Sequence, residues 1–342
     1  MSVHDAPTPI YQDEAQEYDA ILVMSFGGPE GIDDVMPFLE NVTRGRGIPR
    51  ERLEEVAEHY YHFDGVSPIN GQNRALIAAL EAELAAHDIK LPIYFGNRNW
   101  HPFLSDTMRQ MRDDGVKRAL AFFTSAFSSY SGCRQYREDI IQASEGMENP
   151  PEFDKIRMFY NHPGFIEPCV ELLQNALNQF DHPVHVAFTA HSVPMVTANK
   201  SAYEAQLKDA CNLIAQRAGI SDYALVYQSR SGAPHIPWLE PDILDYMDSL
   251  HEKGVQELII MPIGFISDHM EVLFDLDTEA VQKAEEHNMK MVRVATVGTH
   301  PRFISMIREL IEERMTENPV RLALGERGAT HDVCPVDCCP LR

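Results

Sequence analysis

The sequence predicts an α/β fold of two similar lobes, each a parallel sheet flanked by helices, with the active-site cleft between them. Short apolar segments typical of buried strands alternate with amphipathic segments typical of helices. Residues 115–127 (GVKRALAFFTSAF) resemble residues 254–266 (GVQELIIMPIGFI), which indicates that one structural plan occurs twice. The predicted strands are residues 18–26, 92–96, 118–125, 184–190, 224–228, 257–263 and 291–296.

Length and charge restrict the class of protein. The chain has 342 residues, 44% of them hydrophobic, which is enough for two domains with their own cores. Its formal net charge is −23, whereas a nucleic-acid partner would require a basic surface. No apolar run reaches the roughly 18 residues of a membrane helix, and the polar N-terminus does not resemble a signal peptide. We therefore expect a cytoplasmic location without membrane insertion.

The chain begins with a segment that has no helix or strand pattern. Residues 1–17 are rich in Pro, Gln and acidic residues and are expected to form a flexible tail.

The predicted strand over residues 18–26 ends in a glycine turn (GGPEG), which has neither the G-x-G-x-x-G spacing nor the lysine of a phosphate-binding loop. These glycines are better explained by the close approach of a backbone or a flat ligand.

His191 directly follows the predicted strand VHVAFTA. The chain contains fifteen histidines, and a single histidine usually has only a structural role. Ligands of parallel α/β folds, however, bind at the carboxyl ends of the strands, where His191 lies. A histidine of near-neutral pKa at such a position can act as a base or as a metal ligand.

Glu271, Asp275 and Glu279 recur every four residues and therefore share one face of a predicted helix. We call these three residues the acidic stripe. Periodicity alone also fits a stripe that only contacts water. Apolar neighbours such as Phe265 and Phe274 favour a metal site, because carboxylates beside apolar surface resist ionising together and attract divalent cations.

Three of the six cysteines crowd into the C-terminal segment CPVDCC, as Cys334, Cys338 and Cys339. Disulfides are not expected in a cytoplasmic chain, so metal binding explains this spacing better. Three thiolates need a fourth ligand, and both a [2Fe–2S] cluster and zinc commonly take four cysteines. Cys169 and Cys211 lie in helical patterns and are expected to be buried small hydrophobes.

Five segments resemble, in order and spacing, the signature blocks of ferrochelatases, the enzymes that insert Fe²⁺ into a porphyrin. They are LVMSFGGPEG, GVSPINGQNR, TAHSVP, YQSRSGAPHIPWLEP and PIGFISDHMEVLFDLD. The resemblance implies two Rossmann-like lobes, residues 18–160 and 161–298. It also implies a C-terminal helix over residues 299–317 that packs on the first lobe. Residues 318–342 then form a cysteine-bearing extension.

The resemblance also implies roles for individual residues. His191 and Glu271 match the catalytic pair that binds iron and faces the porphyrin nitrogens, and we expect them to act from opposite faces of the macrocycle. Asp275 and Glu279 match outer metal ligands on a helix that is π-like in the family. Phe26 stands where relatives carry Tyr or Met, and phenylalanine cannot ligate iron.

Four residues match porphyrin-binding positions of the family: Arg44, Arg46, Ser67 and Tyr130. The two arginines match with a small offset in alignment. Arginine suits bidentate capture of a porphyrin propionate. Without the resemblance, both arginines would be read as solvated side chains of a glycine-containing loop.

Cys133 resembles the internal cysteine of ferrochelatases that carry an iron–sulfur cluster. In those members it joins three cysteines of a C-terminal extension. The resemblance therefore implies a [2Fe–2S] cluster held by Cys133, Cys334, Cys338 and Cys339, although the C-x₃-C-C spacing is particular to this sequence.

Taken together, the resemblance implies a lyase that inserts Fe²⁺ into coproporphyrin III during haem synthesis, as in cluster-bearing members from Gram-positive and actinobacterial lineages. Protoporphyrin IX is the alternative substrate. A cobalt chelatase would usually show a His-rich metal pair, and a non-enzymatic haem or metal carrier would not need both His191 and Glu271. We expect a monomer whose partners are its two substrates and, transiently, neighbouring enzymes of haem synthesis.

Overall fold

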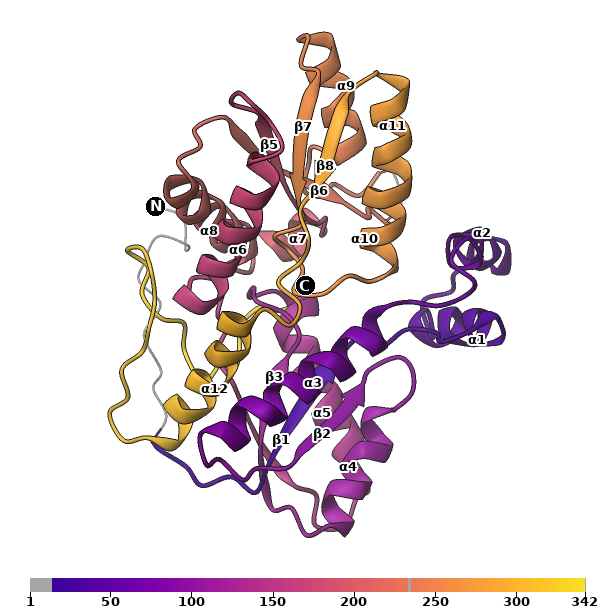
Figure 1. Cartoon of the computed structure of the whole chain (residues 1–342). Coiled ribbons are helices and arrows are strands. Elements are labelled where there is room, and N and C mark those ends of the chain that lie inside the picture. The colour runs from indigo at the N-terminus through magenta and orange to yellow at the C-terminus, as the bar shows by residue number, and fades with distance from the viewer. Residues whose placement is uncertain (1–13, 233–234, 342) are drawn as a thin grey trace.

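The computed structural model describes residues 14–232 and 235–341, and these form two parallel sheets of four strands each. The strand orders are β2-β1-β3-β4 and β6-β5-β7-β8, so the two sheets have the same topology. Figure 1 shows one sheet below the other, each flanked by helices. The predicted α/β fold of two similar lobes is confirmed. Most of the predicted N-terminal tail, residues 1–13, lies outside the described residues.

The first lobe is built around a central strand whose six residues are all buried, as expected for a parallel sheet covered on both faces. Its strands are β1 (Ala20–Ser25), β2 (Ile93–Asn97), β3 (Arg118–Phe123) and β4 (Glu152–Lys155). Its helices are α1 (Ile32–Val42), α2 (Arg50–Tyr61), α3 (Ile69–Ala86), α4 (Leu104–Asp113), the π-helix η1 (Tyr130–Arg134) and α5 (Gln135–Ser144).

The second lobe repeats this plan. Its strands are β5 (His185–His191), β6 (Tyr223–Gln228), β7 (Glu257–Met261) and β8 (Lys290–Arg293). Its helices are α6 (Pro163–Leu177), α7 (Met195–Ala198), α8 (Tyr203–Ala218), α9 (Ile243–Glu252), α10 (Met270–Phe274), the π-helix η2 (Asp275–Glu279) and α11 (Ala280–Glu286). The repeated sequence segment forms β3 in one lobe and β7 in the other, and each pairs with its central strand.

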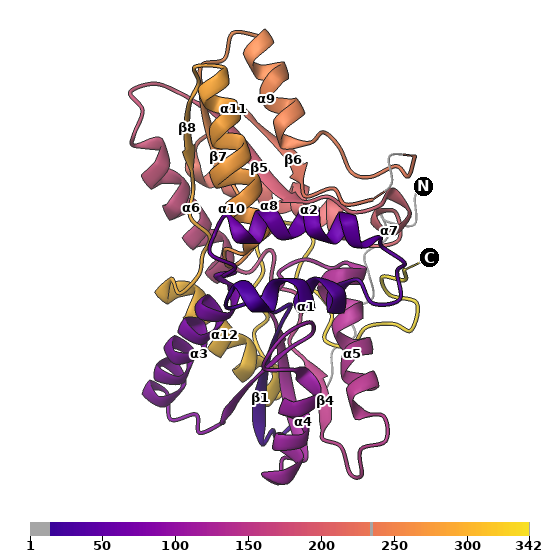
Figure 2. The ribbon, with the colours of Figure 1, turned by 90° about the vertical axis from the view of Figure 1, so that its right-hand side faces the viewer.

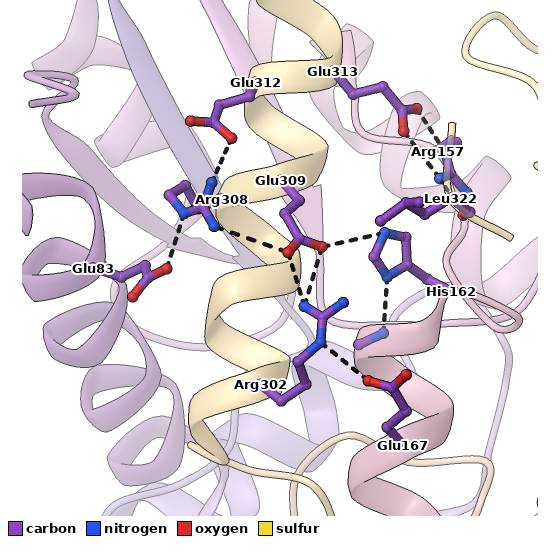
Figure 3. Close-up of polar contacts among 11 residues, drawn as sticks. Glu83, Arg157, His162, Glu167, Arg302, Arg308, Glu309, Glu312, Glu313 and Leu322 are labelled. Atoms are coloured by element: carbon purple, nitrogen blue, oxygen red, sulfur yellow. Dashed lines mark hydrogen bonds and ion pairs between the residues drawn. The ribbon is translucent and has the colours of Figure 1, made fainter. Parts of the chain in front are cut away.

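The last helix, α12 (Pro301–Met315), joins the lobes by packing against both α3 and α6. Figure 3 shows its polar contacts: Arg308 donates to Glu83 of α3 at 2.9 Å, and Arg302 donates to Glu167 of α6 at 3.2 Å. One hydrophobic core continues through this region, since Val23 of β1 and Val186 of β5 belong to the same set of packed buried residues. The lobes are therefore firmly connected on this side.

The C-terminal segment after α12 lies along the first lobe. The Asn161 side chain donates to the carbonyls of Leu324 and Gly328 at 3.2 and 2.8 Å, and the Thr330 hydroxyl donates to the carbonyl of Met158 at 2.7 Å. These contacts fix the extension along the segment that follows β4.

Helices α1 and α2 extend away from the first sheet and have a small core of their own, formed by Val35, Phe38, Leu39, Leu53 and Ala57. Figure 2 shows α2 lying beside α10 of the second lobe, and residues of the two helices are in contact. None of the described helices is long and apolar enough to cross a membrane.

Candidate active site and cysteine site

His191 is the last residue of β5, where the fold places its ring between two elements of the second lobe. Its Nδ1 atom contacts the carbonyl of Ser192, and its Nε2 atom lies 3.4 Å from Oε2 of Glu271. The hydroxyl of Tyr203 donates to the backbone carbonyl of His191 at 3.0 Å. Two partners therefore fix the residue so that Nε2 faces the carboxylate.

Glu271 lies in the first turn of α10. The helix is capped by His269, whose Nδ1 accepts from the backbone N–H of Glu271 at 3.1 Å. This cap fixes the start of the helix and, with it, the backbone of Glu271. Protein surrounds the pair, yet 31% of the His191 side chain and 46% of the Glu271 side chain remain accessible, so substrates can reach both.

The two groups stabilise each other's charged form. Burial alone would lower the pKa of His191, but the Glu271 carboxylate and the Ser192 carbonyl together raise it to about 9. Burial would raise the pKa of Glu271, but the facing His191 lowers it to about 2. At neutral pH the pair is therefore an imidazolium opposite a carboxylate.

The acidic stripe begins on α10 and continues on the π-helix η2. One turn of an α-helix takes fewer than four residues, so side chains spaced four apart drift around it in one direction. One turn of the wider π-helix takes more than four, so the drift there is in the opposite direction. The change of helix type therefore keeps Glu271, Asp275 and Glu279 in line. Asp275 interacts electrostatically with both of the other carboxylates, which shows that the three lie together.

Asp275 is held by the end of β6 and the residue after it. The Ser229 hydroxyl donates to its Oδ2 atom, and Gln228 donates to the same atom at 3.3 Å. Burial raises the pKa of Asp275 to about 7, with Glu271 and Glu279 adding to the shift and the two donors opposing it. Asp275 is thus partly protonated near neutrality, and a cation would displace that proton.

The outer end of the stripe lies near further acidic groups. Burial raises the pKa of Glu279, and the charge of Asp242 adds to this shift. Asp242 lines a cavity of about 430 Å³ together with Ser192, Tyr227 and Asp245. The stripe therefore leads from His191 toward an acidic cavity.

The first lobe covers the site through α2 and α3. The ring of His59 stacks on Phe274 with centroids 3.7 Å apart and an interplanar angle of 7°. Tyr60 lies near enough to Glu271 for the carboxylate to add to the rise in its pKa, which is mainly due to burial. Gln72 accepts from the backbone N–H of Asp268 at 2.8 Å. Both lobes therefore contribute to the walls of the site.

The contact between His191 and Glu271 corrects one expectation. A macrocycle held between two side chains would require about 7 Å, twice a carbon contact distance of about 3.5 Å. The observed separation is 3.4 Å. The two side chains therefore lie on one side of the site in this structure, whereas the expectation placed them on opposite faces of the macrocycle.

The matched porphyrin-binding residues all lie in the first lobe. Arg44 and Arg46 are exposed on the loop between α1 and α2, and their side chains form no ion pair within the described part of the chain. Ser67 is buried against Gly28, where a Cβ atom would come within 2.6 Å of the Ser67 Cβ. The Tyr130 hydroxyl donates to Glu138 at 3.0 Å. No direct contact links these four residues to His191 in the described structure.

The structure brings together the four cysteines Cys133, Cys334, Cys338 and Cys339, which we call the cysteine site. Cys133 is buried in the first lobe, and Cys334 packs against the same buried cluster, where the two thiols interact. Cys334 also contacts Cys338, whose sulfur lies 3.6 Å from that of Cys339. Cys169 and Cys211 are buried elsewhere, and burial raises the pKa of both thiols.

Basic groups surround the cysteine site. Lys155 interacts electrostatically with Cys133 and Cys334, and it favours the ionised form of both. Arg134 donates to the carbonyls of Val336 and Cys338, in each case at 3.1 Å. In a chain of net charge −23, this local positive charge suits a group of thiolates.

Sequence reasoning missed one residue of this site. His331 contributes an imidazole, and its ligand atom lies within 4.8 Å of the sulfurs of Cys334 and Cys338. The spacing H-x₂-C-x₃-C was visible in the sequence and resembles the spacing of metal ligands.

Comparison with known proteins identifies close relatives. A sequence model described as ferrochelatase matches residues 18–315. A protein named ferrochelatase from Rhodopirellula baltica is 56% identical over 331 aligned positions, which cover 95% of this chain and 94% of the relative. The coproporphyrin III ferrochelatase of Streptomyces coelicolor is 52% identical, with 96% of this chain and 95% of the relative covered.

Solved structures resemble the fold at much lower sequence identity. SirB from Bacillus subtilis, solved with Fe³⁺, superposes with a TM-score of 0.51 at 12% identity and covers 88% of this chain and 96% of its own. CbiX, described as the terminal enzyme of sirohaem biosynthesis in denitrifying bacteria, gives a TM-score of 0.50 at 14% identity and covers 86% and 98%. At these identities the likeness shows a shared two-lobed fold.

Proposed function

This chain belongs to the ferrochelatase family of porphyrin metal chelatases, and on that premise we propose that it inserts Fe²⁺ into coproporphyrin III to give Fe-coproporphyrin III in haem synthesis. By reaction class such an enzyme is a lyase. The names of relatives about half identical to this chain support the choice of porphyrin. The single observation that carries the chemistry is the His191–Glu271 pair, which stands at the inner end of the acidic stripe.

The exposed arginines favour coproporphyrin over protoporphyrin. Coproporphyrin carries propionates where protoporphyrin carries vinyl groups, so it offers more carboxylates to basic side chains. Arg44 and Arg46 are exposed and have no intramolecular ion pair among the described residues, which leaves them available for that contact. Guanidinium groups bind carboxylates in a bidentate manner.

The charge state of the pair suggests how metal and protons exchange. Two pyrrole N–H protons must leave the macrocycle as Fe²⁺ enters. When Fe²⁺ reaches Glu271, the charge of the metal opposes the positive charge on His191, so the imidazolium releases its proton to solvent and exposes the Nε2 lone pair. His191 can then accept one pyrrole proton, release it to the solvent that reaches 31% of its side chain, and accept the second in the same way.

The remaining members of the acidic stripe would deliver the metal. Asp275 and Glu279 offer carboxylate oxygens, and proton release from the partly protonated Asp275 offsets part of the arriving charge. We propose that Fe²⁺ passes from the cavity beside Asp242 along the stripe to Glu271.

An anaerobic metallation assay tests the proposed function. Purified protein is incubated with Fe²⁺ and either coproporphyrin III or protoporphyrin IX, with Co²⁺ and a corrin precursor as a third arm, while the porphyrin absorption bands are followed. We expect the fastest metallation with Fe²⁺ and coproporphyrin III. Faster turnover of protoporphyrin IX would overturn the assignment of coproporphyrin III as the substrate. Faster metallation of the corrin precursor with Co²⁺ would indicate a cobalt chelatase, and porphyrin binding without turnover would indicate a carrier.

We further propose that the cysteine site holds a [2Fe–2S] cluster, ligated by Cys133, Cys334, Cys338 and Cys339. The donor set fits, because four thiols converge from two distant parts of the chain beside Lys155. Such a cluster cross-links its ligands and exchanges single electrons. Metallation changes no oxidation state, so we assign the cluster a structural role. Analysis of anaerobically prepared protein should find about two irons and two sulfides per chain, whereas one zinc would show that the metal assignment is wrong.

The setting of the enzyme follows from the same proposal. We propose a cytoplasmic monomer that contacts neighbouring enzymes of haem synthesis only transiently. The strongly acidic net charge supports the absence of a nucleic-acid partner.

A further inference from the structure

We propose that His331 is part of the cysteine site as a hydrogen-bond donor to the cluster thiolates, and that it raises the reduction potential of the cluster. This inference rests on the proposed [2Fe–2S] cluster. The Nε2 atom of His331 lies 3.8 Å from the sulfur of Cys338, and a ring nitrogen lies within 4.8 Å of the sulfur of Cys334. With four thiols already present, the imidazole is available as a donor rather than required as a ligand.

The position of His331 does not depend on the cysteines. Lys155 donates to its backbone carbonyl at 3.1 Å. On one side, Thr330 donates to the carbonyl of Met158 at 2.7 Å. On the other side of His331, the buried Asp332 accepts two hydrogen bonds from Arg321, one of them at 3.0 Å. The scaffold therefore presents the imidazole to the sulfurs before any metal binds.

An N–H group that points at a thiolate sulfur withdraws electron density from it. Reduction adds a negative charge to the cluster, so this hydrogen bond becomes stronger in the reduced state and favours it. Lys155 and Arg134 add positive charge around the same sulfurs but donate to backbone carbonyls. The His331 imidazole is the basic side chain that directly contacts two of the sulfurs within the described structure.

Redox titration of the full-length protein tests this role. The visible spectrum is followed during reduction by dithionite with mediators, at one fixed pH for all proteins. His331→Leu removes the N–H, and His331→Gln keeps an N–H donor of similar length. His182→Leu, an exposed histidine of the second lobe that pairs with Glu257, is the control.

We expect His331→Leu to shift the potential downward, His331→Gln to shift it less, and His182→Leu to leave it unchanged. All four proteins should contain the same iron and sulfide. If the parent holds a cluster and His331→Leu leaves its potential unchanged, the role of His331 is overturned and the cluster stands. If His331→Leu loses its cluster but His331→Gln keeps one at the parent potential, the donor role is supported. A parent without iron and sulfide overturns both proposals.

Discussion

The Nε2 atom of His191, at the end of β5, lies 3.4 Å from the Oε2 atom of Glu271, at the start of α10. The fold explains this proximity, because β5 pairs with β7 and α10 follows β7 after a short loop. The carboxyl ends of two adjacent parallel strands therefore deliver both groups to one point. The pair is a product of topology rather than of local sequence.

Removal of either member of this pair should abolish most of the turnover. We expect His191→Ala and Glu271→Gln each to lower the metallation rate at least ~10²-fold, as for loss of a general acid–base group. Porphyrin affinity, measured by fluorescence titration, should remain nearly unchanged. Glu285→Gln, on the exposed face of α11, is the matched control. Turnover of His191→Ala within a few-fold of the parent would contradict the mechanism.

Neutralising the outer carboxylates should affect iron capture more than chemistry. In Asp275→Asn and Glu279→Gln we expect the apparent KM for Fe²⁺ to rise more than kcat falls, because these residues contact the metal before the reaction. Initial rates over a series of Fe²⁺ concentrations give both constants. If a variant with both substitutions shows the same dependence of rate on Fe²⁺ concentration as the parent, Asp275 and Glu279 only contact water and do not deliver the metal.

Iron capture should also depend on pH through Asp275. Its pKa of about 7 means that the carboxyl is mostly protonated below pH 7 and ionised above it. Since Fe²⁺ must displace that proton, the apparent KM for Fe²⁺ should fall as the pH rises through 7. Rates measured between pH 6 and 8 check this expectation. Asp275→Asn should weaken the dependence without abolishing it, because the metal also displaces the proton of His191, whose pKa is about 9. An unchanged dependence in this variant would place the titrating group elsewhere.

Each cysteine of the proposed cluster should be necessary for colour. We expect the reddish-brown absorption to disappear when any one of Cys133, Cys334, Cys338 and Cys339 is changed to Ser. Cys169→Ser should retain the absorption, since that thiol is buried in the core away from the site. The colourless variants should unfold at lower temperature yet metallate porphyrin below it, because Asn161 and Thr330 still hold the extension. Full activity loss at low temperature would contradict a structural role.

The ion pair between Arg157 and Glu313 gives a prediction about stability. Both side chains are buried, and two hydrogen bonds of 2.6 and 3.0 Å join them (Figure 3). Glu313→Leu leaves the buried Arg157 cation without this carboxylate and should lower the free energy of unfolding by roughly 3–5 kcal/mol. Arg157→Met should cost less, because Glu313 keeps Arg321 at 3.4 Å. Urea unfolding measures both changes in the free energy of unfolding.

A surface pair provides the control for this experiment. Arg52 and Glu55 lie 2.6 Å apart on α2 with most of both side chains exposed. Arg52→Met should change the free energy of unfolding by less than about 1 kcal/mol. A comparable loss in Arg52→Met and Glu313→Leu would show that burial of the Arg157–Glu313 pair has no special effect.

Local patterns in the sequence predicted most of the fold. Each observed strand except β4 overlaps a predicted one, because buried parallel strands are continuous apolar runs. The edge strand β4 (EFDK) is short and polar, so no such run marks it. The acidic stripe was predicted from its four-residue spacing, and the structure brings its three carboxylates together.

Features that depend on distant contacts were harder to predict. The role proposed for His331 arises because Lys155 and Met158 hold the extension in place, and no local pattern encodes that docking. The proximity of His191 and Glu271 was missed for the same reason. The resemblance identified both residues but carried no distance between them, which only the packing of α10 beside β5 determines.

The position of α12 has a consequence for how the chain matures during synthesis. Arg157 leaves the ribosome 156 residues before Glu313, the carboxylate that neutralises it. Until then its cation has no buried partner on α12, and α3 and α6 lack the helix that packs against both. We therefore expect neither lobe to reach its native core while translation continues. Nascent chains should remain sensitive to protease until α12 has emerged, in contrast to proteins whose N-terminal domains fold first.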